Sequence, residues 1–503
     1  MNEANTAIVI GGGITGLATA ALLARDSYHV TLLEKQPVVG GRAGSWESDG
    51  FRFDTGPSWY LMPEVFDHFF RLLDTSAGEQ LDLVKLDPGY RVLFEEGEPI
   101  TVTSDRAENV ALFESIEPGA GDRLARYLDS ASDTYEMAKK RFLYSTFASF
   151  APLLRRDVLT RLPTLVRLLL QSLHSRVAQT VNDPRLQQIL GYPAVFLGSS
   201  PFRTPSMYHL MSHLDLTDGV YYPHGGFARV IDRIAALATD AGASIRTSAP
   251  VRRILVEDGR AVGVELDDGI RLHADIVVST ADLHHTETVL LQGEEQTYPE
   301  KCWRTRVAGP GAMLLYLGVR GEVPQLEHHT LLFAKDWRAN FNAIFGKRTK
   351  IPDVPSVYVC KPSAVDPGVA PEGDSNLFVL MPIPADPGLD ELDSLGDRVI
   401  DQIAEWAEIP DLTERILVRR MVGPADFARE LNSWKGSSLG PAHILKQSAF
   451  FRGSNRSRKV RGLYYAGSSS APGIGLPMCL ISAELVIKRL RGDVSTTPLA
   501  GPL

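Results

Sequence analysis

The chain has 503 residues, of which 44% are hydrophobic and 22% are charged, the balance of a globular protein with a large core. Its formal net charge of −9 argues against nucleic acid as a general partner. The three cysteines lie far apart and form no C-x-x-C pair, which excludes a disulfide framework and a cysteine-rich zinc site.

We expect no targeting or membrane-spanning segment. Residues 1–5 are too short and too polar for a signal peptide. No stretch reaches 18 apolar residues, so a transmembrane helix is not expected. Together with the sparse cysteines, these features predict a cytoplasmic protein.

Residues 6–35 predict a strand, a glycine-rich loop, a helix and a second strand. Gly11, Gly13 and Gly16 fit the pattern G-x-G-x-x-G, in which the glycines permit a tight turn, the approach of a pyrophosphate and close helix–strand packing. The helix N-terminus offers N–H groups and a partial positive charge to the phosphates. Glu34, 23 residues after Gly11, is placed to accept hydrogen bonds from a ribose. We therefore predict a bound dinucleotide rather than a purely structural glycine turn.

Two further segments favour FAD over NAD as the dinucleotide. In the first, Arg42 follows the pair Gly40–Gly41, which suits a backbone that crosses a pyrophosphate while the cation faces the phosphate or the isoalloxazine. A simple hairpin is the alternative for this glycine pair. The second segment is a short strand that ends in the turn Gly56-Pro57-Ser58. A dehydrogenase that binds NAD alone needs neither segment.

The range 139–176 has an unusual composition, with eight Lys or Arg residues against one acidic residue. It follows a helix expected at 123–140 and short strands expected between 81 and 103. One apolar stripe at helical spacing is formed by Leu162, Leu165, Val166, Leu169, Leu170 and Leu173. A basic amphipathic helix is typical of a membrane-surface element. A helix packed on its own domain with a solvated basic face is the alternative.

The middle of the chain predicts a return to the nucleotide-binding sheet. Residues 218–242 indicate a turn and an amphipathic helix, and His224 in that turn is a candidate base, although a polar turn residue is the favoured role. Residues 244–282 indicate strands joined by tight turns, and the last of them, 276–279, suits a buried strand of the nucleotide-binding sheet. The backbone of Val251 is placed to hydrogen-bond an adenine.

The last third of the chain predicts a mixed substrate domain and a closing nucleotide-binding unit. Strands are expected at 311–319, 355–360 and 376–383, and a helix at 397–408. Residues 461–489 then repeat the order of strand, glycine-rich loop and helix that is expected at the start of the chain. The N-terminus of that last helix is placed to face the pyrimidine end of a flavin and to stabilise its anionic reduced form.

These motifs resemble the FAD-dependent phytoene desaturases of bacterial carotenoid synthesis, in their actinobacterial form. The resemblance rests on GGGITGL…LLEK, GGRAG, FDTGPSWYLMPEVFDHFF, YYPHGGF, VVSTAD and GLYYAGSSSAPGIGLP, which span nearly the whole chain. It implies the fold shared with amine oxidases and a peripheral membrane enzyme that removes hydrogen from 15-cis-phytoene, often through to lycopene, with quinone or oxygen as acceptor. The closing loop at 468–475 departs from the AGTHPGGG form of many relatives, which leaves room for another polyene substrate.

Several alternatives to phytoene desaturation remain open. A ketolase, a 3,4-desaturase or a C30 desaturase would share every motif. An amine oxidase would share the FAD domain, and a prenyl-lipid escort would use the same fold without flavin. No Ser/His/Asp set or metal-ligand cluster is apparent, so we expect no metal, and we expect His284–His285 and His328–His329 at the surface or in helix caps.

The sequence thus predicts an α/β protein with a Rossmann-type FAD-binding domain built from discontinuous segments, a mixed-sheet substrate domain and a helical membrane-facing region. The expected segments are 1–103, 222–290 and 456–503 for FAD, 104–221 for the membrane-facing region and 291–455 for the substrate domain. The expected FAD-binding residues are Gly11, Gly13, Gly16, Glu34, Lys35, Gly41, Arg42, Gly56, Pro57, Ser58, Val251, Gly467, Gly475, Pro477 and Met478. The expected residues for docking at the inner face of the cell membrane are Arg155, Arg156, Arg161 and Arg167.

Overall fold

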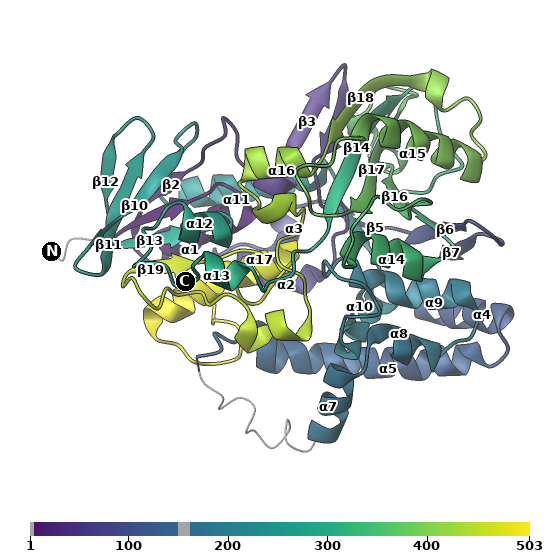
Figure 1. Ribbon diagram of the computed structural model, residues 1–503, viewed down its shortest axis with the longest axis horizontal. Coiled ribbons are helices and arrows are strands. Elements are labelled where there is room, and N and C mark those ends of the chain that lie inside the picture. Colours follow the sequence, from purple (N-terminus) through teal and green to yellow (C-terminus); the bar gives the residue numbers. More distant parts are fainter. Residues whose placement is uncertain (1–4, 149–160) are drawn as a thin grey trace.

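The computed structural model describes residues 5–148 and 161–503. It contains two large sheets side by side, and a layer of helices lies along the second sheet (Figure 1). The two ends of the chain and its middle contribute to the first sheet, whereas the second sheet is built mainly from residues 311–422. No helix among the described residues has the length and apolarity needed to cross a bilayer.

The first sheet is parallel and is assembled from three separated parts of the chain. Its strand order is β19-β13-β1-β2-β9. The strands are β1 (Thr6–Ile10), β2 (His29–Leu33), β9 (Ser244–Arg246), β13 (Ile276–Ser279) and β19 (Leu463–Tyr465). Neighbouring strands pair in parallel throughout. The predicted Rossmann-type sheet built from discontinuous segments is therefore confirmed.

Both faces of this sheet are covered, which explains why its strands read as continuous apolar runs. Along β1, Ala7 and Val9 pack toward the helices α1 (Ile14–Arg25), α11 (Gly226–Asp240) and α17 (Leu476–Arg491). Ile8 and Ile10 face the opposite side, as strand alternation requires. There they join the core under β10 (Val251–Glu257), β11 (Arg260–Leu266) and β12 (Arg271–His273). The predicted hairpin turns of this three-stranded sheet are confirmed.

The second sheet is mixed and has seven strands in the order β18-β14-β17-β16-β15-β6-β7. Its strands are β6 (Tyr90–Phe94), β7 (Ile100–Val102), β14 (Gly311–Val319), β15 (His329–Phe333), β16 (Val357–Cys360), β17 (Ser375–Ile383) and β18 (Ile416–Val422). We placed β6 and β7 in the first FAD-binding segment, but β6 pairs with β15 instead. Strands β6 and β7 therefore complete the seven-stranded sheet, through a long-range pairing that no local pattern in 81–103 indicates.

The faces of the seven-stranded sheet have different partners. One face packs on α15 (Leu392–Trp406). The other packs on the helical layer, which contains α4 (Arg106–Ile116), α5 (Ala120–Ala138), α8 (Leu173–Ala178) and α9 (Pro184–Gly191). Shorter elements complete the described chain: α2 (Pro63–Leu72), α3 (Ala77–Gln80), β3 (Ser45–Ser48), β4 (Phe51–Asp54), β5 (Leu83–Lys85), β8 (Tyr221–Pro223), α10 (Met211–His213), α12 (Leu283–Thr288), α13 (Glu300–Trp303), α14 (Trp337–Phe345) and α16 (Pro424–Leu431).

The apolar stripe predicted for residues 162–173 does not form one helix. The chain forms α7 (Leu162–Leu170), leaves the helix at Gln171 and begins α8 at Leu173, because the Ser172 side chain caps α8 by accepting from the Ser175 N–H. Leu168, outside the predicted stripe, is buried, with 2% of its surface exposed. Val166 and Leu170, inside the stripe, are 43% and 74% exposed.

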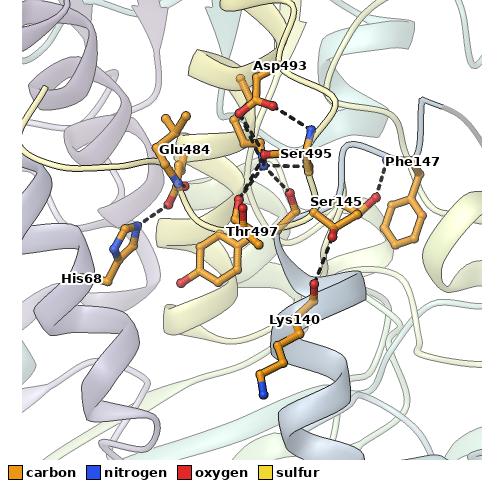
Figure 2. A network of polar contacts seen from close by, with 12 residues as sticks. His68, Lys140, Ser145, Phe147, Glu484, Asp493, Ser495 and Thr497 are labelled. Atoms are coloured by element: carbon orange, nitrogen blue, oxygen red, sulfur yellow. Dashed lines mark hydrogen bonds and ion pairs between the residues drawn. The ribbon is translucent and has the colours of Figure 1, made fainter. Parts of the chain in front are cut away.

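A buried lysine on α17, Lys488, ties the segment that follows the α5 region to the helices of the parallel sheet. Figure 2 shows the surrounding polar contacts, in which Glu484, Asp493, Ser495 and Thr497 are labelled. The Lys488 ammonium on α17 donates to the carbonyls of Tyr144, Ser495 and Thr497 at 2.7–3.0 Å. Asp493, 3.8 Å away, balances its charge. On the same helix, Glu484 contacts His68 of α2 at 2.9 Å. These contacts hold the C-terminal tail and the end of the α5 region against α17.

Candidate functional site

A continuous cavity of about 1100 Å³ runs from the parallel sheet to the seven-stranded sheet. At one end it is lined by the loops that follow β1, β2, β13 and β19. These loops lie at the carboxyl ends of the parallel strands, where open α/β sheets bind their ligands. We call this part of the cavity the flavin end and define it by the loops 11–15, 34–36, 280–282 and 467–479.

Two helices point uncapped N-termini into the flavin end. Helix α1 begins after Gly13 and helix α17 begins after Gly475, and both glycines line the cavity. Neither helix has a side-chain cap or an acidic residue in its first turn. The N–H groups and partial positive charge of each terminus therefore remain available to a ligand. Two such termini facing one cavity fit a dinucleotide that carries phosphates and a ring that becomes negatively charged on reduction.

The glycines of the first loop differ in what surrounds them. Gly11 has a φ of +102°, a conformation that L side chains rarely adopt. A Cβ on Gly16 would lie 1.8 Å from the Gly11 carbonyl oxygen, so helix α1 packs on the turn through this glycine. A Cβ on Gly13 would meet no atom nearer than 3.9 Å, because Gly13 opens on the cavity. This loop thus leaves space for a group close to its backbone, as a pyrophosphate requires.

Glu34 and Lys35 follow β2 and line the flavin end. The Glu34 carboxylate accepts from the Gly12 N–H at 2.6 Å and from the Gln36 N–H at 2.8 Å, so it supports the shape of the loop. The Lys35 ammonium turns away to the Arg429 carbonyl and the Asn432 side chain, both at 3.0 Å. Contact of Glu34 with a ribose stays a prediction.

The segment around Arg42 crosses over the glycine loop. Gly40 bridges to Gly13, and a Cβ on Gly41 would lie 3.2 Å from the Gly13 Cα. The Arg42 guanidinium donates to the Ser438 carbonyl at 2.8 Å and to the Ser433 hydroxyl at 2.9 Å. Burial lowers the pKa of Arg42, and the nearby Asp282 carboxylate offsets part of that effect.

The remaining predicted FAD residues have the following places. Gly41, Arg42, Gly56, Pro57, Ser58, Val251, Gly467, Gly475, Pro477 and Met478 all line the cavity. Ser58 hydrogen-bonds Tyr358 at 2.7 Å, at the border with the seven-stranded sheet. Gly16 lies behind the loop, in helix α1, and does not line the cavity. The structure thus brings together predicted residues from the first, middle and last parts of the chain.

The loop 467–475 is held by two side chains that the sequence analysis missed. Arg452 donates to the carbonyls of Ser468 and Ser470. His443 accepts from the Ile474 N–H through Nε2 at 3.1 Å, and its Nδ1 contacts the Tyr208 hydroxyl at 2.9 Å. Burial, with Arg452 nearby, lowers the pKa of His443 well below its ordinary value, so the ring is neutral. Neither Arg452 nor His443 lies in a sequence motif. The unusual sequence of the loop 468–475 was the signal that this loop needs different supporting side chains.

The other end of the cavity is an apolar arm under the seven-stranded sheet, also missed from the sequence. Its lining side chains are Trp59, Tyr192, Phe196, Leu331, Phe333, Trp337 and Phe341. They come from loops, from β15 and from α14. Aromatic pairs join them, with ring centroids 5.4 Å apart for Trp59 and Phe196 and 4.9 Å for Phe333 and Trp337. The arm suits a long apolar ligand that reaches the flavin end.

His224 and the two docking residues that the structure describes, Arg161 and Arg167, do not line the cavity. His224 is not among the described residues that line it; its N–H donates to the Asp82 carbonyl, and its ring lies 4.0 Å from the Asp82 carboxylate. Arg161 and Arg167 are exposed on and beside α7. Arg155 and Arg156 lie outside the described residues. A role of these four arginines at a membrane stays a prediction.

Comparison with known proteins places these features in a family. A family model described as "Flavin containing amine oxidoreductase" matches residues 14–487. A carotenoid 3,4-desaturase of Haloarcula japonica is 42% identical over 97% of this chain and 98% of its own length. A zeta-carotene-forming phytoene desaturase of Myxococcus xanthus is 35% identical over 96% and 93% of the two chains. A solved oxidoreductase from Methanosarcina mazei shares the fold, with a TM-score of 0.65 and 18% identity over 96% of this chain and 100% of that one.

Proposed function

The chain belongs to the flavin-containing amine oxidoreductases, an FAD-dependent family, and on that premise we propose that it desaturates a carotenoid polyene. The observation that carries the proposal is the continuity of the cavity, in which an apolar aromatic arm opens directly onto the flavin end. A substrate without polar groups can reach a redox cofactor through such a path without crossing water. The product would be a polyene with an additional C=C bond in place of a CH–CH bond.

Within this proposal, FAD supplies the acceptor for the hydrogen removed from the substrate. The residues of the chain bind, orient and exclude water. The first and last helices direct their N-termini to the cofactor, while Arg42 and the loop 467–475 border it. Aromatic side chains of the apolar arm hold an extended polyene by its faces. We also propose that the fifteen residues predicted from the sequence form the FAD-binding site, with Gly16 acting through packing.

We propose phytoene as the substrate, the function suggested by the sequence motifs. A second candidate is desaturation at the 3,4 position of a carotenoid that is already unsaturated. It is favoured by the 42% identity to a 3,4-desaturase, against 35% to a phytoene desaturase. In this proposal the two reactions use the same flavin end of the cavity. They differ in how far the substrate enters the apolar arm.

Pigment analysis distinguishes the two substrates. The chain is expressed in cells that accumulate phytoene and, separately, in cells that accumulate lycopene. Conversion of phytoene to zeta-carotene, neurosporene or lycopene supports the first proposal. Conversion of lycopene alone supports the second. Flavoprotein that converts neither polyene contradicts both.

We further propose that the protein docks on a membrane surface through α7 and passes electrons to quinone or oxygen. The support for docking is chemical. Val166 and Leu170 are exposed apolar residues on the same short helix as the exposed cation Arg167, and Arg161 precedes the helix. Apolar side chains beside cations are the combination that binds an anionic bilayer.

The docking proposal is tested with vesicles of anionic and of neutral lipid. Replacing Val166, Leu170, Arg161 and Arg167 together by serine is expected to lower binding to anionic vesicles at least tenfold, since each cation contributes about 1 kcal/mol at such a surface. The matched control replaces Lys347 and Arg348 by serine, two exposed cations in the loop that follows α14. Unchanged binding of the α7 variant would reject this surface as the docking site.

A further inference from the structure

Three buried side chains with metal-binding atoms meet behind the wall of the apolar arm. His328 precedes β15, His329 begins it, and Cys360 ends β16. His329 and Cys360 are direct partners in the antiparallel register, so their side chains share one face of the sheet. The three side chains are 4%, 0% and 1% exposed, and one ligand atom from each lies within 4.8 Å of the other two. We call these three residues the His–His–Cys cluster.

The imidazoles of the cluster are not satisfied by the surrounding protein. Among the described residues, Nδ1 and Nε2 of His328 and Nε2 of His329 have no hydrogen-bond partner. An unpaired buried polar atom costs about 1–3 kcal/mol, so three together call for an explanation. The sequence-based expectation that His328 and His329 lie at the surface or in caps is therefore wrong. Both are buried: His329 pairs with Cys360 in the sheet, and the carbonyl of His328 accepts from the Lys361 N–H at 2.8 Å.

His329 already has the hydrogen bonding of a metal ligand. Its Nδ1 lies 2.8 Å from the Tyr358 hydroxyl, which in turn lies 2.7 Å from the Ser58 hydroxyl. When Nδ1–H donates to Tyr358 and Tyr358 donates to Ser58, the lone pair of His329 is on Nε2. Metal-binding histidines characteristically donate their other N–H in this way. Trp59 stacks on the ring at 4.4 Å and 9°, which fixes its plane.

We propose that the His–His–Cys cluster binds one thiophilic transition-metal cation, copper(I) or zinc(II). A point equidistant from three atoms 4.8 Å apart lies about 2.8 Å from each, against roughly 2.0–2.3 Å for bonds from zinc to nitrogen or sulfur. Closure by about half an ångström would complete the coordination. Two imidazoles and a thiolate are ligands that copper and zinc accept and that magnesium and calcium do not.

The cluster offers a metal two imidazole nitrogens and one thiol sulfur, all on side chains that are at most 4% exposed. Binding would release the thiol proton to solvent, form metal–sulfur and metal–nitrogen bonds and leave the oxidation state of the metal unchanged.

The charges around the cluster favour copper(I). A copper(I) thiolate is neutral, whereas a zinc(II) thiolate keeps a positive charge in an interior that already contains the Lys361 ammonium beside His328. The Asp366 carboxylate, also near His328, offsets part of that charge. The metal would join β15 to β16 behind Trp59 and Tyr358, both of which line the cavity. This is a closed site that supports the arm and takes no part in the redox chemistry.

The test measures metal on the full-length flavoprotein. Purified protein is incubated separately with copper(I), zinc(II) and, as a spectroscopic probe for zinc, cobalt(II), and is then passed over a chelating column. We expect one retained equivalent of copper(I) or zinc(II), and a thiolate-to-cobalt charge-transfer band. Cys360→Ser and His328→Gln should each lose the retained metal. Cys302→Ser, which changes the partly exposed cysteine, should keep it.

Two outcomes would overturn the proposal: no metal retained by wild-type protein, or equal retention by Cys360→Ser. Far-ultraviolet circular dichroism and flavin content establish that each variant is folded. If a variant does not fold, X-ray absorption at the metal edge of the wild-type protein decides, since one sulfur and two nitrogens support the site and any other set rejects it. None of these measurements needs substrate, so their failure is separate from failure of the proposed desaturation.

Discussion

The two ends of the cavity are built in different ways. The flavin end consists largely of backbone: glycine turns, helix N-termini and loops whose carbonyls accept hydrogen bonds from arginine side chains. The apolar arm consists of large side chains that reach one space from loops, a strand of the second sheet and helix α14. A cofactor used by a whole family can be held by backbone, which every sequence possesses. A particular polyene must be recognised by side-chain shape, and shape is set residue by residue.

The largest expected effect tests whether the flavin end depends on the close approach of two backbone segments. Gly16→Ala places a Cβ 1.8 Å from the Gly11 carbonyl oxygen, where neither backbone segment can yield. We expect a loss of about 3 kcal/mol or more in the free energy of unfolding, and protein without flavin. Thermal unfolding and flavin absorbance measure the two effects. In the control, Gly78→Ala, the new Cβ meets nothing within 4 Å, so a similar loss there would show that the clash is not the cause.

Gly13→Ala separates cofactor binding from folding at the same loop. Its Cβ would meet no protein atom nearer than 3.9 Å, and Gly13 already has a φ of −72°, so the protein without FAD should unfold as the wild type does. The methyl group would occupy space in the flavin end. We expect the Kd for FAD to rise at least tenfold, which corresponds to about 1.4 kcal/mol. Titration of the FAD-free protein measures it, and unchanged affinity would mean that the cofactor does not approach this backbone.

A buried acid behind the apolar arm gives a pH-dependent prediction. Asp215 accepts from the hydroxyls of Tyr192 at 2.7 Å and Tyr90 at 3.1 Å, and burial raises its pKa to about 7. The folded protein therefore retains a proton that the unfolded chain releases, so stability should fall as pH rises from about 4 to about 7 and then level off. Asp215→Asn should flatten this dependence in denaturant titrations.

Part of the pH dependence should survive in Asp215→Asn, because burial also raises the pKa of Asp54 to about 6. Asp54→Asn is the matched comparison, since its carboxylate accepts from the N–H groups of Phe227 and Ala228 instead of from tyrosines. An Asp215→Asn protein whose stability changes with pH as steeply as the wild type would contradict a protonated acid behind the arm.

The smallest expected effect tests whether side-chain shape in the apolar arm controls the entry of the substrate. Phe196→Trp adds volume at a partly buried ring that lines the apolar arm. We expect the KM for the polyene to rise several-fold with flavin content unchanged, because the change narrows the path without touching the flavin end. Steady-state assays in detergent or vesicles measure it. Phe451→Trp, at a ring that is 67% exposed, should leave KM unaltered.

Much of the fold was predictable because its signals are local. The strand–loop–helix pattern at each end of the chain, the alternation of β10 to β12 and the glycine-rich turns are encoded within windows of a few residues. Those windows also contain the predicted flavin-end residues, from Gly11 in the first loop to Met478 in the last helix. The family resemblance rests on the same motifs, which explains why cofactor and fold class follow from the sequence.

Only the tertiary structure decided how distant strands pair and which side chains meet, because the sequence of one strand does not indicate which distant strand it will pair with. The register of β15 with β6 and β16 moved residues 90–102 into the second sheet and buried His329 opposite Cys360. The same packing gathered Trp59, Phe196 and Trp337 around one arm. The sequence by itself determined what the backbone binds. Only the folded chain determined which side chains line the apolar arm, because their convergence depends on contacts between residues that are hundreds of positions apart.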